Sequence, residues 1–145
     1  WRPVFNGVEK AQNIIRLDER SGFSITGIGL ERLCMAVNHL PTARDVDYIA
    51  PVYDAADKQE DELVIESLRA LHRIYSDIEH YSCQPGKHQK QKIRTLIKNI
   101  SDKYDSRKIR ELLNIHSSTQ PWHPEMQAGI EPTIERIERY KRNIK

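Results

Sequence analysis

One eleven-residue stretch, Phe23–Leu33, constrains this chain more than any other. It reads FSITGIGLERL, and apolar and polar residues alternate over its first four positions, as they do in a half-buried strand. Gly27 and Gly29 then let the backbone pass close to a bulky group. An apolar helical pattern, LCMAV, follows over residues 33–37. The stretch therefore predicts a strand that passes through small residues into a helix.

Glu31 and Arg32 stand at the start of that helical pattern. A planar guanidinium can stack on a base or bind a phosphate, and glycines leave room for a ligand, so the arrangement suits a nucleotide site. The other interpretation is a tight strand-to-helix turn followed by a solvated helix start. The eleven residues by themselves leave both interpretations open.

The stretch resembles motif 3 of the class II aminoacyl-tRNA synthetases, Gly-φ-Gly-φ-Glu-Arg with φ apolar. Its last eight residues, from Thr26, match the version found in alanyl-tRNA synthetases. Further segments are similar to that family in the same order, over about residues 1 to 100: Trp1–Asn6 (WRPVFN), Asp45–Val52 (DVDYIAPV), Val64–Leu71 (VIESLRAL) and Ile93–Lys98 (IRTLIK).

This resemblance implies a ligase of protein biosynthesis that activates a carboxylate with ATP and transfers it to a tRNA. The implied cofactor is ATP with Mg²⁺. The implied partners are the tRNA acceptor stem and a small carboxylic or amino acid, and not DNA. Arg32 would be the catalytic residue that contacts ATP. The same resemblance implies an ATP- and substrate-binding set that comprises Trp1, Ile25, Thr26, Gly27, Gly29, Glu31 and Arg32.

Three departures from the family pattern qualify the resemblance. Ile25 stands where alanyl enzymes carry an aspartate for the substrate amino group, and an isoleucine offers a buried ammonium no acceptor. Gly86 stands where the family has an asparagine that reads the acceptor stem. Motifs 1 and 2 belong upstream of Trp1. We therefore expect an upstream catalytic segment on the same or another chain, and an inactive segment without it.

A basic run supports the expectation of a nucleic-acid partner. Residues 84–101 hold five lysines or arginines, one histidine and no acidic residue, although the net charge of the chain is only +2. Cations that neutralise phosphates release counterions, whereas the alternative is a solvated helix face. Because the run falls where the family has its tRNA-recognition domain, the predicted tRNA-binding residues are Lys87, Lys90, Lys92, Arg94 and Lys98.

The expected fold class is α+β, with short antiparallel N-terminal strands at the edge of a class II synthetase sheet and a mostly helical region after them. Strands are expected at residues 1–5, 13–18 and 23–26. Residues 1–40 would be the C-terminal part of a catalytic domain with motif 3. Residues 41–145 would form a helical domain like the tRNA-recognition domain.

Apolar periodicity and capping residues predict helices over residues 61–81, 88–102, 106–113 and 132–144, with Thr42 as a further N-cap. Residues 116–124 are rich in Ser and Pro and are expected to form a loop or internal linker, with His116 and His123 at the surface.

No metal site is predicted, because His80, Cys83 and His88 lack the paired spacing of zinc ligands. No apolar run approaches the roughly 20 residues that span a bilayer, so no membrane partner is expected. Two cysteines make no disulfide framework, and the cytoplasm is the expected compartment. Two alternatives remain: a synthetase paralogue that charges a different acid or carrier, and a non-catalytic RNA-binding helical module.

Overall fold

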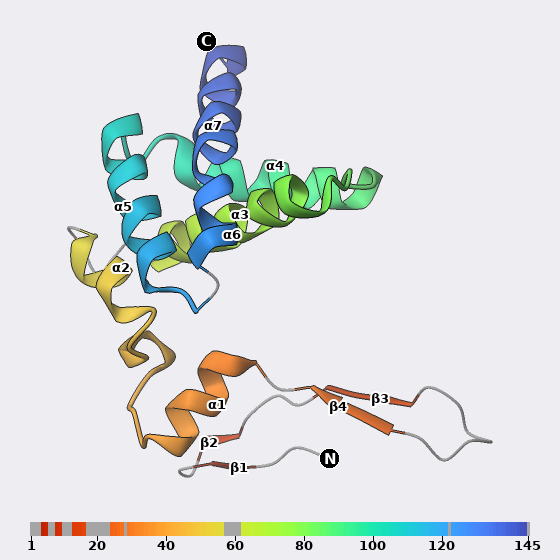
Figure 1. Cartoon of the computed structure of the whole chain (residues 1–145), viewed down its shortest axis with the longest axis vertical. Coiled ribbons are helices and arrows are strands. Elements are labelled where there is room, and N and C mark those ends of the chain that lie inside the picture. Colours follow the sequence, from red (N-terminus) through yellow and green to blue (C-terminus); the bar gives the residue numbers. More distant parts are fainter. Residues whose placement is uncertain are drawn as a thin grey trace. The chain divides into compact units, whose positions relative to one another are not determined.

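The structure is a computed structural model of the chain. It describes residues 4–5, 8–9, 13–16, 24–27, 29–56, 62–121 and 123–144. The chain divides into two compact units, Trp1–Val46 and Asp47–Lys145. Figure 1 shows the helices and strands of each unit.

The first unit contains four short strands, of which the backbone is described. β1 (Val4–Phe5) pairs antiparallel with β2 (Val8–Glu9), and β3 (Asn13–Arg16) pairs antiparallel with β4 (Ser24–Gly27). The result is two separate two-stranded ladders rather than one sheet.

Helix α1 (Leu30–Val37) follows in the same unit. It ends in a Schellman turn, in which the Leu40 N–H donates to the carbonyl of Met35 over 2.9 Å and His39 takes a φ of 53°. The short 3₁₀ helix η1 (Ala43–Asp45) comes next, and Thr42 is its N-cap, which confirms the capping prediction.

The described part of the second unit contains six helices. They are α2 (Ala50–Ala55), α3 (Glu62–Tyr81), α4 (Lys87–Ser101), α5 (Ser106–Thr119), α6 (His123–Ala128) and α7 (Ile130–Ile144). The long helix α3 packs against α4, α6 and α7, and α5 packs against α2, α6 and α7. In the described part of the chain, no helix has the length and apolar character needed to cross a membrane.

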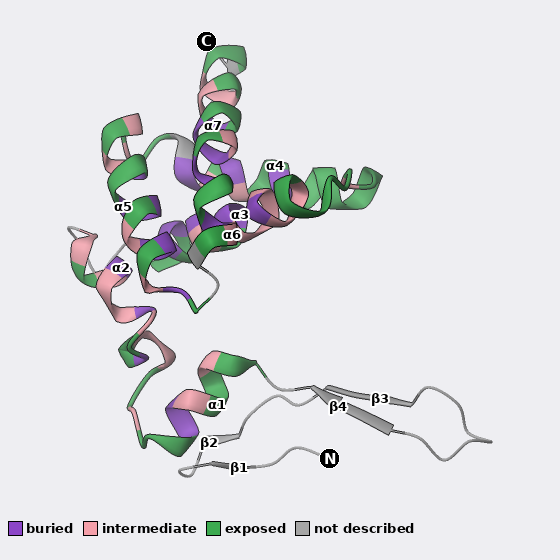
Figure 2. Ribbon diagram, in the orientation of Figure 1, coloured by how far each residue is buried: buried purple, intermediate pink, exposed green. Residues whose placement is uncertain are grey.

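The core of this unit is formed by one side of each helix. On α3 the buried side chains recur with the helical period, and those of α4, α5 and α7 meet them (Figure 2). Burial of each large aliphatic side chain contributes about 1.5–3 kcal/mol. The largest fully buried members include Ile65, Leu68, Leu71, Ile100, Ile109, Leu112, Leu113 and Ile137.

The expected α+β fold class is wrong. From residue 29 onward, 79% of the described residues are helical and none is in a strand, and the described core consists of helical side chains. The ladders of residues 4–27 contain two strands each and do not join into the expected sheet edge. The alternation of apolar and polar residues before Gly27 is accounted for by the pairing of two short strands. The apolar pattern with a period of 3.6 residues recurs later in the chain, and its residues form the core.

The predicted loop at residues 116–124 is also wrong over most of its length, since only residues 120 and 121 of its described part lie outside a helix. Helix α5 continues to Thr119, well past the predicted end at residue 113, and α6 begins at His123. The Thr119 hydroxyl can donate its one proton to the carbonyl of Tyr48, 3.0 Å away, or to that of Ile115, 3.1 Å away, so tertiary contacts outweigh the low helix propensity of Ser and Thr. The helices predicted at residues 61–81, 88–102 and 132–144 are confirmed to within two residues.

Candidate nucleic-acid interface

Helix α4 presents an exposed basic surface. Its apolar side chains Ile93, Ile97 and Ile100 are buried and fix the helix against the core. Every predicted tRNA-binding residue lies on α4 with an exposed side chain: Lys87, Lys90, Lys92, Arg94 and Lys98.

Four of these five cations form a stripe along one flank of α4, which we call the basic stripe: Lys87, Lys90, Arg94 and Lys98. Their spacings of three, four and four residues place them within about 80° of one another around the helix axis, over a length of about 16 Å. Lys92 lies on the other flank. The sequence therefore arranges most of the basic run as a line rather than as a scattered set.

The loop before α4 and one contact with α3 orient the basic stripe. Ser82 ends α3 with a φ of 49°, and Gly86 caps α4 with its N–H donated to the Gln89 side-chain oxygen over 2.7 Å. Farther along, the Asn99 amide donates to the Ser67 hydroxyl over 3.0 Å. These contacts hold the two helices as a hairpin, so the cations are presented on a fixed backbone.

The motif 3 residues lie in the first unit. Arg32 is exposed in the first turn of α1, and Glu31 beside it is half-buried. Gly29 is the N-cap of α1 with a φ of −61°, and a Cβ there would meet only the Glu31 carboxylate at 3.8 Å, so its backbone does not require glycine. Ile25, Thr26 and Gly27 belong to β4, whose backbone alone is described, and Trp1 lies outside the described residues.

A buried histidine pair was missed by sequence reasoning, and the surface placement of His116 is wrong. His72 on α3 is 0% exposed and His116 on α5 is 4% exposed. Their Nδ1 atoms lie 3.0 Å apart, and Nε2 of His72 lies 2.7 Å from the carbonyl oxygen of Met126. The spacing of His116 from Ile109 and Leu112 places it on the buried face of α5, and this was the signal that could have found it.

The hydrogen bonds fix the tautomers of this pair. A carbonyl can only accept, so His72 donates through Nε2 and must accept at Nδ1 the proton that His116 carries on its own Nδ1. Burial lowers the pKa of His72 to about 4. Burial lowers the pKa of His116 to about 3, with smaller contributions from electrostatic repulsion by Arg69 and by any protonated His72. Both rings are therefore neutral at pH 7. Their hydrogen bonds connect α3, α5 and α6.

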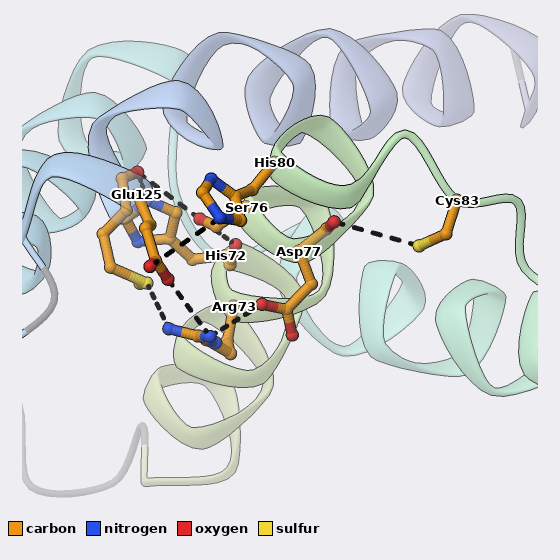
Figure 3. A network of polar contacts seen from close by, with 8 residues as sticks. His72, Arg73, Ser76, Asp77, His80, Cys83 and Glu125 are labelled. Atoms are coloured by element: carbon orange, nitrogen blue, oxygen red, sulfur yellow. Dashed lines mark hydrogen bonds and ion pairs between the residues drawn. The ribbon is translucent and has the colours of Figure 1, made fainter.

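A network of polar contacts joins α3 and α6 beside His72 (Figure 3). The Arg73 guanidinium lies 2.7 Å from the Asp77 carboxylate and 3.5 Å from that of Glu125, and His80 lies 3.9 Å from Glu125. The residues are partly exposed, so each pair contributes about 1 kcal/mol at most. Within the described residues, no group of three or more His, Cys, Asp or Glu side chains could hold a metal ion.

Comparison with known proteins gives no match: no family model, no curated protein and no solved structure is significantly similar to this chain. The resemblance to alanyl-tRNA synthetases therefore depends on the sequence motifs alone. Two candidate sites were predicted, the motif 3 site and the basic surface of α4. The geometry of the basic surface is the more fully described, because the side chains of all five of its cations are described.

Proposed function

We propose that this chain binds RNA through α4, as the tRNA-recognition part of a cytoplasmic, alanyl-type synthetase-like ligase. The observation that carries the proposal is the basic stripe, an exposed line of cations within an eighteen-residue stretch, residues 84–101, that contains no acidic residue. Each cation that neutralises a phosphate releases counterions, which favours binding of a nucleic-acid backbone.

The same geometry supports affinity more than sequence specificity. Lysines and arginines on a helix contact phosphates, whereas base identity is read by side chains that reach base edges. Gly86, at the position where the family carries its base-reading asparagine, has no side chain with which to do so. We therefore expect RNA binding with a steep salt dependence and little preference for the sequence of the stem.

Fluorescence anisotropy with an acceptor-stem RNA hairpin, over a series of salt concentrations, tests this proposal. The double variant Lys90→Gln/Arg94→Gln should lower the slope of log K against log salt by about two and weaken binding about tenfold at 0.1 M salt. The control Lys103→Gln/Arg142→Gln removes the same charge from exposed positions outside the stripe. Equal losses in both variants, or no RNA binding by the unaltered chain, would contradict the proposal.

The catalytic part of the proposed function depends on Arg32 as the residue that contacts ATP. This role is supported by the motif 3 resemblance and by the exposure of the side chain. ATP–pyrophosphate exchange should be measured on the chain joined to an upstream catalytic segment of the kind that the resemblance implies, with a panel of amino and hydroxy acids. Arg32→Ala should reduce exchange at least about 100-fold, as loss of a single stabilising donor does in other enzymes. Arg32→Lys keeps the charge but not the planar group, so it should recover little activity.

Each outcome of the exchange experiment points to a different function. No segment of this chain resembles motif 2, so the 145 residues alone are not expected to form an adenylate. With the upstream segment present, exchange with an acid other than alanine would indicate a synthetase paralogue that charges a different acid. The presence of Ile25 favours this alternative. A folded protein that binds RNA but shows no exchange with any acid would be the non-catalytic RNA-binding module.

A further inference from the structure

A cavity of about 290 Å³ lies between α3, α4 and α7, beside the basic stripe. The charged side chains that line it are all cations, Lys90 and Arg94 from α4 and Arg136 from α7. The remaining lining residues are the uncharged Tyr75, Ile78, Gln84, Pro85, Ile93 and Ile97. A cavity with three cations and no carboxylate among its described lining residues favours an anionic ligand.

Three packed helices fix these cations relative to one another. Ile93 and Ile97 are buried and stand three residues after Lys90 and Arg94 respectively, and the fully buried Ile137 follows Arg136. Helix α7 packs against both α3 and α4. The packing of these helices therefore brings Arg136 of α7 to the same cavity as Lys90 and Arg94 of α4.

Tyr75 adds a hydrogen-bonding group to the cavity. Tyr75 and Arg136 both line the cavity, and the positive charge of Arg136 acts to lower the pKa of the Tyr75 hydroxyl. Burial raises the pKa of Tyr75 and outweighs the opposing effect of Arg136 and Arg139, so the hydroxyl keeps its proton at neutral pH and can donate it. Among the described residues, no carboxylate forms an ion pair with Lys90, Arg94 or Arg136.

We propose that this cavity binds the phosphate group of a nucleotide. A phosphate offers several oxygen acceptors and up to two negative charges, which match two guanidinium groups, one ammonium and one hydroxyl. The apolar side of the cavity, formed by Ile78, Pro85 and the two isoleucines of α4, can contact the attached nucleoside. The inference rests on the proposed RNA binding only where the phosphate belongs to an RNA, since a free mononucleotide presents the same group.

Calorimetric titration of the 145-residue chain with AMP and with adenosine, at constant ionic strength, tests the inference. We expect AMP to bind and adenosine not to bind. Arg136→Gln should weaken AMP binding at least about tenfold, and Tyr75→Phe should weaken it to a smaller extent. The control Arg142→Gln removes an equal charge from the same helix outside the cavity, and it should change the affinity less than twofold.

A second arm repeats the two α7 variants with the RNA hairpin and so identifies the source of the phosphate. A loss of RNA affinity in Arg136→Gln but not in Arg142→Gln, without AMP binding, would support the cavity and assign the phosphate to RNA. Equal effects of the two variants on both ligands would overturn the inference. In that case a loss of RNA affinity in Lys90→Gln/Arg94→Gln, absent from its matched control, would still support the proposed function.

Discussion

Replacing Gly129 by alanine is expected to lower the free energy of unfolding by about 3 kcal/mol or more. Gly129 stands between α6 and α7, where the chain meets α3 at Ser76. An added Cβ would overlap the Ser76 hydroxyl and would lie 2.7 Å from the Ser76 nitrogen and 2.9 Å from its Cα. Two of these atoms belong to the backbone of a packed helix, so rotation of a side chain cannot relieve the overlap.

Urea unfolding followed by circular dichroism measures this effect. Gly86→Ala is the control, because a Cβ there would meet only the Gln89 side-chain oxygen at an ordinary 3.6 Å, and we expect a loss of about 1 kcal/mol or less. Adding Ser76→Ala to Gly129→Ala should restore only part of the stability, since the backbone overlap remains. Similar losses in Gly129→Ala and Gly86→Ala would mean that Gly129 does not approach α3 this closely.

The buried histidine pair should make the helical unit labile to acid. The pKa of each ring is lowered in the folded state, to about 4 for His72 and about 3 for His116, from an ordinary value of 6.5. As the pH falls below 6.5, the unfolded chain takes up protons that the folded chain does not. The stabilisation that depends on the neutral rings is therefore complete well above pH 6.5. It is lost as the pH falls toward 4 for His72 and toward 3 for His116, by about 1.5 kcal/mol per histidine between pH 6.5 and pH 5.

Urea unfolding at pH 7, 6 and 5 measures this loss, with His72→Gln/His116→Gln as the comparison, since glutamine does not titrate. The stability of the double variant should depend on pH less steeply over this range. Nitrogen-15 NMR of the imidazoles should also find the proton on Nε2 of His72 and on Nδ1 of His116. Equal pH dependence in the two proteins would show that the pair does not remain neutral in the folded state.

The helical part of the fold could be predicted because its signal is local. The apolar spacing of Val64, Ile65, Leu68 and Leu71 requires a helix with one buried face, and this is what α3 forms. The α+β class was wrong because it depended on strands joining a larger sheet, and two-stranded pairing can satisfy the same alternation. The prediction of a loop at residues 116–124 was wrong because it depended on the low helix propensity of Ser and Thr. The contact with Tyr48 that extends α5 is tertiary and cannot be derived from such propensities.

The sequence by itself determined the helical periods of the second unit and the line of cations on α4, because the spacing of residues along one helix fixes which of them share a face. Only the tertiary structure decided that His72 meets His116, that Gly129 lies against Ser76, and that Arg136 joins Lys90 and Arg94 at one cavity. These contacts join residues 42 to 53 positions apart in the chain. The packing of helices that creates them depends on the whole core rather than on any local pattern.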